Sequence, residues 1–205
     1  MPTAGPQLDP ETGQNYEIGH RWQGFRGRLN TSAALYRLQR QNVVIARGGG
    51  LYDQAGQQTS KGVDLDINGT LGYGIQMVAN YGYSSPRYDS FFASNRTVNL
   101  SGKVPRFVQK HAANLWLTKA WNSGFTTSTG MRFVGPVFTN DANLFRLGGY
   151  TVFGGAVGYR FRHTEWSLNA ENLLNRARYF TGAAFANQVY PGSPINVFIT
   201  ARFRM

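Results

Sequence analysis

The sequence predicts an all-β chain, an antiparallel up-and-down sheet that forms part of a transmembrane β-barrel, and three observations lead to this prediction. Apolar and polar residues alternate with a period of two along many segments, which is typical of strands with two unlike faces. Short and long connections between these segments alternate strictly. Charged residues make up only 15% of the 205 residues and aromatic residues make up 14%, as expected where one face of a sheet contacts lipid.

Nine segments carry the alternation and are predicted to be strands. In the clearest, residues 63–71, Val, Leu and Ile alternate with Asp, Asp and Asn, and residues 195–203 alternate in the same way. The predicted strands span residues 14–23, 28–40, 58–71, 74–86, 109–121, 125–136, 150–162, 165–173 and 194–204. They are longer than the five or six residues usual in globular sheets, which favours strands that cross a membrane.

The connections between these strands place tight turns at one end of the sheet. Short connections at 24–27, 72–73, 122–124 and 163–164 alternate with long ones at 41–57, 87–108, 137–149 and 174–193. Glycine and asparagine are expected to supply the positive φ that tight hairpins need. Outer-membrane barrels have short periplasmic turns and long outer loops, whereas a soluble sandwich has loops at both ends. Residues 1–13 are then expected to be an incoming extracellular loop.

Aromatic residues gather near the ends of the predicted strands, as they do at the two interfaces of a membrane. The residues assigned to these girdles are Trp22, Tyr36, Tyr73, Tyr81, Tyr83, Trp121, Phe133, Phe161 and Trp166. Bacterial single-chain barrels close with an even number of strands, and an open sheet edge cannot lie in lipid. Nine strands therefore predict part of a barrel.

Several other classes of protein are excluded. No run approaches the ~18 apolar residues of a spanning helix, which excludes a helical membrane protein. The chain has no cysteine and only three scattered histidines, so no disulfide scaffold and no metal site are expected. No nucleophile motif or phosphate loop occurs, and the chain is not expected to be an enzyme. The first residues contain no charged region followed by an apolar stretch, so no signal peptide is expected in this sequence.

Six segments, in order along nearly the whole chain, resemble TonB-dependent siderophore receptors. They are Leu8–Gly19, Ala33–Val43, Gln58–Asp66, Leu147–Val152, Asn169–Asn175 and Pro194–Val197. The third, Gln-Thr-Ser-Lys-Gly-Val-Asp-Leu-Asp, is similar to a Ser-Lys/Arg-Gly-Val-Glu-Leu-Glu strand of that family. The chain ends in Met205, where the family usually has an aromatic residue.

The resemblance implies a 22-stranded barrel of the outer membrane, with an N-terminal plug folded inside it. Residues 1–205 would be the C-terminal portion of that barrel, a fragment not competent for transport alone. Its partners would be outer-membrane lipid, a ferric siderophore, and the N-terminal strands and plug that this sequence lacks. The TonB protein would act only through the absent plug region. No cofactor is expected, because the siderophore carries the iron.

The resemblance also suggests two sets of functional residues. The acidic residues Glu17, Asp64 and Asp66 are expected to face arginines of the plug, with ordinary polar lining of the lumen as the alternative. Aromatic and basic residues of the long loops are candidates for contact with the siderophore, with loop-on-loop packing as the alternative. These candidates are Arg87, Tyr88, Phe91, Phe92, Arg96, Phe138, Phe145, Tyr179, Phe180 and Tyr190.

Two other functions fit part of the pattern. The net charge of +11 would suit a basic soluble β protein that binds nucleic acid through arginine and aromatic residues. Such a protein needs both residue types on one face, whereas here apolar residues occupy one face of most strands, so no nucleic-acid partner is expected. The other alternative is a small passive porin-like pore formed by several copies of the chain.

Overall fold

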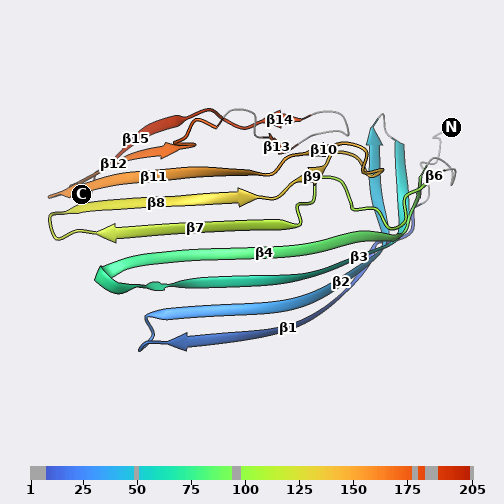
Figure 1. The fold of residues 1–205 in the computed structure, drawn as a ribbon, viewed down its shortest axis with the longest axis horizontal. Coiled ribbons are helices and arrows are strands. Elements are labelled where there is room, and N and C mark those ends of the chain that lie inside the picture. The colour runs from blue at the N-terminus through green and yellow to red at the C-terminus, as the bar shows by residue number, and fades with distance from the viewer. Residues whose placement is uncertain (1–7, 49–50, 94–97, 177–179, 183–188, 204–205) are drawn as a thin grey trace.

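A computed structural model describes residues 8–48, 51–93, 98–176, 180–182 and 189–203. Nine strands form one antiparallel sheet in the order β1-β2-β3-β4-β7-β8-β11-β12-β15, so neighbours in the chain are neighbours in space (Figure 1). These strands are β1 (Thr12–Gly24), β2 (Leu29–Gly48), β3 (Leu51–Thr70), β4 (Ile75–Ser90), β7 (His111–Ala120), β8 (Phe125–Val134), β11 (Tyr150–Phe161), β12 (Thr164–Glu171) and β15 (Asn196–Phe203). The predicted up-and-down sheet is confirmed, and it is open in this chain.

The long connections carry short strands of their own. Three two-stranded ribbons lie between the strands of the main sheet. They are β5 (Phe92–Ala93) with β6 (Val98–Asn99), β9 (Val137–Phe138) with β10 (Arg146–Leu147), and β13 (Phe180–Gly182) with β14 (Tyr190–Pro191). Within the described ranges no helix is long and apolar enough to cross a membrane. A single 3-10 turn, η1 (Gly72–Gly74), joins β3 to β4.

The sequence analysis was wrong about residues 41–57, which were expected to be a loop. Strands β2 and β3 remain paired far beyond the predicted strand ends, with Val43 opposite Ala55 and Ala46 opposite Tyr52. In Figure 1 the far ends of both strands bend away at the end of the sheet that carries the long connections. The alternation fades there, whereas backbone pairing continues, because the hydrogen bonds of a ladder do not depend on side-chain polarity.

The tight turns rely less on glycine than expected. Phe25, Arg26 and Tyr73 adopt positive φ angles of 53°, 58° and 59°. Arg162 does the same in the turn between β11 and β12, at 51°. Only Gly124, at 83°, is a glycine filling this role alone within its turn. Exposed turn residues can take this conformation at a modest steric cost, so the turn composition understated where positive φ occurs.

The strand register gives the sheet one polar and one apolar face. Asp66 lies opposite Ser32 on one side and Asn80 on the other, whereas Leu65 lies opposite Ala33 and Tyr81. The same alternation continues into the later strands. The polar face includes Glu17, Asp64, Asp66, Asn80 and Asn114, and the apolar face includes Ile18, Leu35, Leu65, Met77 and Leu115.

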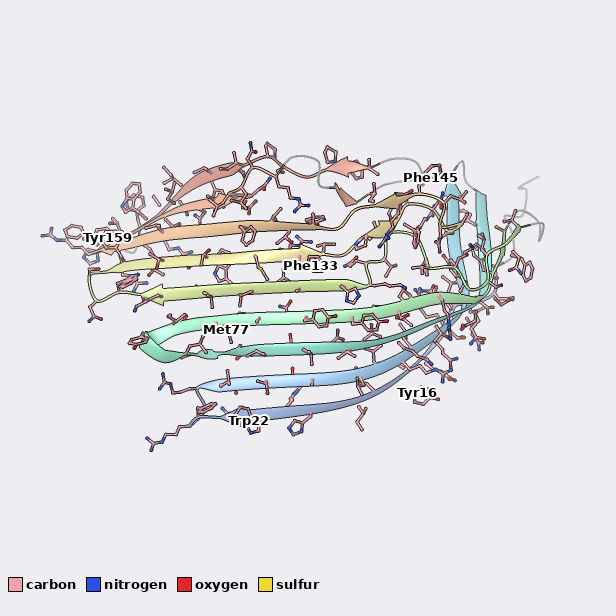
Figure 2. The ribbon with its side chains drawn as sticks, in the orientation of Figure 1. Tyr16, Trp22, Met77, Phe133, Phe145 and Tyr159 are labelled. Carbon is pink, nitrogen blue, oxygen red and sulfur yellow. The ribbon has the colours of Figure 1, made fainter. Side chains whose placement is uncertain are left out.

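Tyr36 is an exception to the predicted aromatic girdles. The register places it between Glu17 and Gly62, on the polar face. Its ring lies flat over Gly62, where an added Cβ would come within 2.3 Å of the Tyr36 ring. The other described girdle aromatics in the strands lie on the apolar face, and Figure 2 shows Trp22 and Tyr159 near the tight turns with Tyr16 toward the other end.

The sheet has no protein core of its own. Large apolar side chains of the apolar face remain exposed in the isolated chain, among them Ile18 at 73% and Ile199 at 71%. Most of the buried apolar residues gather instead at the end of the sheet that carries the long connections, in a group that we call the loop cluster: Val43, Tyr88, Phe91, Ala93 and Leu100. Burial of the apolar face therefore has to come from outside the described chain.

Candidate functional site

The three predicted acidic residues share the polar face. Glu17 lies opposite Tyr36 on β2, Asp64 lies opposite Ala34 and Gly82, and Asp66 lies opposite Ser32 and Asn80. They are placed there because residues two apart in a strand point to the same side of the sheet. The side chains of all three are exposed.

The surroundings of these carboxylates are polar or small. Asp66 accepts a hydrogen bond from the Ser32 hydroxyl at 3.2 Å. Beside Asp64, Ala34 and Gly82 leave the carboxylate uncovered, and the position of a Cβ added at Gly82 would be 3.3 Å from Asp64 Oδ1. Among the described residues, none of the ion pairs involves Glu17, Asp64 or Asp66. The three carboxylates are thus available to pair with cationic groups that approach the polar face of the sheet.

Two of the predicted ligand contacts lie in the loop cluster. Tyr88 and Phe91 are only 3% and 2% exposed, and their ring centroids lie 4.7 Å apart. Their backbones are fixed as well, because Leu100 N–H donates to Phe91 O at 2.8 Å and Tyr88 N–H donates to Lys103 O at 2.9 Å. Both rings are used in packing between connections and offer almost no surface to a molecule outside them.

Asp141 ties the loop cluster to the connection between β8 and β11. Its Oδ1 accepts hydrogen bonds from the Tyr88 hydroxyl at 2.8 Å and from Arg106 N–H at 3.0 Å. Its Oδ2 lies 3.6 Å from Arg106 Nε. Burial, followed by the neighbouring Asp141 carboxylate, raises the pKa of the Tyr88 hydroxyl, so this hydroxyl remains a donor at neutral pH. The sequence analysis did not single out Asp141.

Asn143 makes a second link between the same connections. Its Oδ1 accepts from Val104 N–H at 2.8 Å, and its Nδ2 donates to Val104 O at 2.7 Å. It has a φ of 59°, a conformation that asparagine tolerates better than most residues. Together with Asp141 it holds residues 98–110 against residues 137–147. Their hydrogen-bond partners in the structure reveal this role.

The remaining loop candidates differ in exposure. Phe92 is 45% exposed, Phe145 is 62% exposed and Tyr190 is 52% exposed, so these rings present surface to solvent. Phe138 is half-buried, and Arg87 is exposed beside Asp89, with 3.5 Å between Nε and Oδ1. Figure 2 shows Phe145 among the long connections, away from the tight turns. Arg96 and Tyr179 lie outside the described residues, as does the side chain of Phe180.

A groove on the polar face was missed by the sequence analysis. It has a volume of about 260 Å³ and is lined by Trp116 of β7, Arg132 of β8, Tyr150 of β11, Glu171 of β12 and their neighbours. The indole of Trp116 lies across Gly130, where an added Cβ would be 2.0 Å from the ring. Alternation could have found it, because Trp116 shares the parity of Asn114 and Thr118.

These arrangements suit binding. In the part of the chain that the structure describes, no group of three or more acidic or histidine side chains is placed to hold a metal ion. The polar face offers carboxylates, arginine and an indole, which can hold charged and aromatic groups by ion pairing, hydrogen bonding and stacking.

Comparison with known proteins identifies the fold. Residues 1–175 match the family described as "TonB dependent receptor-like, beta-barrel". The chain belongs to this family. Members of this family are receptors and transporters, which agrees with the polar-face and loop chemistry described above.

Curated relatives of this TonB-dependent receptor chain include siderophore receptors. The ferrichrome outer membrane transporter/phage receptor of Escherichia coli K12 is 26% identical over 206 residues, 95% of this chain and 27% of that protein. The ferric-pyoverdine BN7/BN8 receptor of Pseudomonas putida is 29% identical over 197 residues, 96% of this chain and 23% of that protein. The chain thus spans about a quarter of the length of these relatives.

Solved structures show the same fold at lower identity. The siderophore receptor PiuA from Acinetobacter baumannii superposes with a TM-score of 0.83 at 24% identity, covering 98% of this chain and 29% of that one. The ferric yersiniabactin uptake receptor FyuA from Yersinia pestis gives 0.78 at 20% identity, covering 99% and 32%. The nine-stranded sheet therefore corresponds to part of a receptor barrel.

Proposed function

We propose that this chain is the C-terminal part of the barrel wall of an outer-membrane receptor that takes up ferric siderophores in a TonB-dependent manner. The observation that carries the proposal is the division of the sheet into an apolar and a polar face over all nine strands. Lipid would bury the apolar face, and the polar face would line the lumen. Iron enters as cargo on the siderophore, and TonB acts through a plug that these residues do not include.

The connections support an orientation for the wall. The turns around 25–28, 71–74, 121–124 and 162–163 are short and lie at one end, where periplasmic turns belong. The long connections with their loop cluster lie at the other end and would face the outside of the cell. Of the described loop candidates, Phe92, Phe145, Tyr190, Phe138 and Arg87 are the ones that we expect to contact a siderophore there.

The edges of the sheet support a partner with an odd number of strands. β1 and β15 both run from the long connections toward the tight turns, because the sheet has nine antiparallel strands. A segment that closes the barrel with antiparallel pairs must begin and end with strands running the other way, and so has an odd strand count. A 22-stranded barrel leaves thirteen strands, which satisfies this condition.

The three carboxylates fit a contact with a plug inside the barrel. Glu17, Asp64 and Asp66 face the same side, are exposed, and make no ion pair within the described ranges. Arginines of a plug would supply the missing positive charge, and partly dehydrated ion pairs at that surface would hold the plug in register with the wall.

The test is refolding of the full chain from urea by dilution, with and without detergent micelles. We expect a β-type circular dichroism spectrum only with micelles, because the apolar face needs an apolar solvent. A soluble, folded monomer in plain buffer would contradict the proposal. Salt-dependent binding to single-stranded oligonucleotides would favour a nucleic-acid-binding protein, and steady conductance of the chain alone in planar bilayers would favour a passive pore.

A second experiment tests orientation by cysteine labelling, because the chain has no cysteine of its own. Asn122→Cys labels a tight turn and Leu144→Cys labels a long connection. In outer membranes of intact cells that also contain the remaining barrel segment, a membrane-impermeant maleimide should label only Leu144→Cys. Labelling of Asn122→Cys alone would reverse the proposed orientation.

A further inference from the structure

Four neighbouring strands present a hydrogen-bond donor at the same level of the apolar face. The register pairs Tyr16 of β1 with Arg37 of β2, Arg37 with Lys61 of β3, and Lys61 with Ser85 of β4. We call Tyr16, Arg37, Lys61 and Ser85 the donor row. Tyr16 is 63% exposed, and the Arg37 and Lys61 side chains are exposed as well.

The donor row lies at the boundary of the apolar face. The next row toward the tight turns is apolar and aromatic, with Ile18, Leu35, Val63 and Tyr83 in register across the same four strands. The Tyr83 ring packs against the ring of His111 on β7 in a tilted arrangement, with the centroids 5.1 Å apart. If the apolar face contacts lipid, as the proposed function requires, the donor row lies at the level of the lipid headgroups of the outer leaflet.

Among the described residues, the charges in the donor row lack a counter-ion. Arg37 and Lys61 are directly opposite each other on adjacent strands, and like charges so placed destabilise a sheet. In the described part of the chain neither residue forms an ion pair. The nearby Asp89 is already engaged, since it pairs with Arg87 and accepts a hydrogen bond from the Thr59 hydroxyl.

We propose that the donor row binds the phosphate of a lipid headgroup, an inference that rests on the proposed function. The Arg37 guanidinium can donate two parallel hydrogen bonds to a phosphate, and the Lys61 ammonium supplies a second charge. Tyr16 and Ser85 flank this pair on the outer two strands, where their hydroxyls can donate to other oxygens of the headgroup region. The acyl chains of the same lipid would lie along Leu35 and Val63, which a free phosphate ion cannot use.

The experiment uses the full chain refolded in phosphate-free dodecyl maltoside micelles. Phosphatidic acid, or cholesteryl hemisuccinate as an anionic lipid without phosphate, is titrated in, and bound lipid is measured by native mass spectrometry. We expect retention of phosphatidic acid and little retention of the hemisuccinate. Equal retention of both would overturn the assignment to phosphate.

Variants locate the site. The double change Arg37→Gln with Lys61→Gln should weaken phosphatidic acid binding roughly 30-fold, from about 1 kcal/mol for each basic residue near a lipid surface. The matched control, Arg21→Gln with Arg202→Gln, removes the same charge from the polar face and should leave binding unchanged. Equal loss in both double variants would overturn the proposed location.

Two further measurements on the unaltered chain test the proposal even if the double variant does not refold. In the unaltered chain, phosphatidic acid should protect the Lys61 amine from acetylation, and absence of protection would overturn the proposal. Inorganic phosphate should not displace the lipid, and full displacement at equal concentration would assign the site to free phosphate. Failure of the chain to refold in micelles contradicts the proposed function itself, whereas refolding without lipid preference contradicts only the donor row.

Discussion

The nine-stranded sheet, which we call the wall, and the loop cluster differ in how far they bury their apolar side chains. In the wall, Ile18 and Ile199 remain 73% and 71% exposed, while in the loop cluster Phe91 is 2% exposed. Both regions are rich in aromatic residues, so composition does not separate them. The difference shows that the wall depends on a surrounding solvent that is apolar, whereas the loop cluster carries a small core suited to water.

The largest expected effect is on the loop cluster. Phe91→Ala removes its most buried ring and should destabilise the cluster by about 3–5 kcal/mol, the usual cost of Phe→Ala in a core. Phe92→Ala, which alters the neighbouring residue at 45% exposure, is the control and should have little effect. Hydrogen exchange of the Leu100 amide reports the opening, and equal protection in both variants would contradict a packed cluster.

The cost of a charged substitution in the sheet should depend on which face carries the residue, and not on how deeply the residue is buried in the protein. Leu115→Arg places a charge on the apolar face near the middle of β7 and should cost about 2–4 kcal/mol in a bilayer. Asn114→Arg, one residue away on the polar face, should cost far less. Refolding yields in lipid vesicles over a urea series measure both, and similar yields would mean that β7 does not face lipid on that side.

Removal of the Asp141 charge should weaken the contact between the two long connections that it joins. Asp141→Asn keeps the shape of the side chain but removes the charge that faces Tyr88 and Arg106, and charge-assisted hydrogen bonds contribute about 1.5–3 kcal/mol. We expect faster exchange of the Arg106 amide with unchanged protection in β7 and β8. Equal loosening of the wall would show that the two regions unfold as one.

The smallest expected effect appears at alkaline pH. The raised pKa of Tyr88 means that its neutral form is favoured in the folded cluster. Stability from this group is therefore complete below the ordinary tyrosine pKa of about 10 and falls as pH rises above it, by up to about 1.4 kcal/mol per unit. Absorbance at 295 nm should show the same tyrosinate signal near pH 10.5 for the unaltered chain and Tyr88→Phe.

A tyrosinate signal that is smaller by one residue in Tyr88→Phe than in the unaltered chain would show that the Tyr88 hydroxyl ionises in this range and would contradict its raised pKa.

Much of the wall could be predicted from the sequence, because alternation is a local property. Residues such as Leu65 and Asp66 differ in polarity from their chain neighbours, which fixes the face of each before any partner strand is known. The positions of all nine main strands followed from it. The ends of β2 and β3 did not follow, because pairing outside the membrane continues without an apolar face.

The candidate site likewise has a part that could be predicted from the sequence and a part that could not. The shared face of Glu17, Asp64 and Asp66 could be expected from parity in two strands. The burial of Tyr88 and Phe91 could not, since it depends on segments that are separated in sequence and that Asp141 and Asn143 help to hold together. The plug contact of the three carboxylates and the siderophore contacts of the exposed loop aromatics stay predictions.

The sequence by itself determined that this chain forms an antiparallel sheet with one face for lipid and one for a polar interior. Period-two alternation and connection length carry that information within a few residues. Only the tertiary structure decided which side chains meet across strands, because register aligns residues such as Arg37 and Lys61 that lie 24 positions apart. It also decided that the long connections fold into a cluster. Their burial arises from contacts between segments that are distant in sequence, and such contacts produce no periodic pattern within either segment.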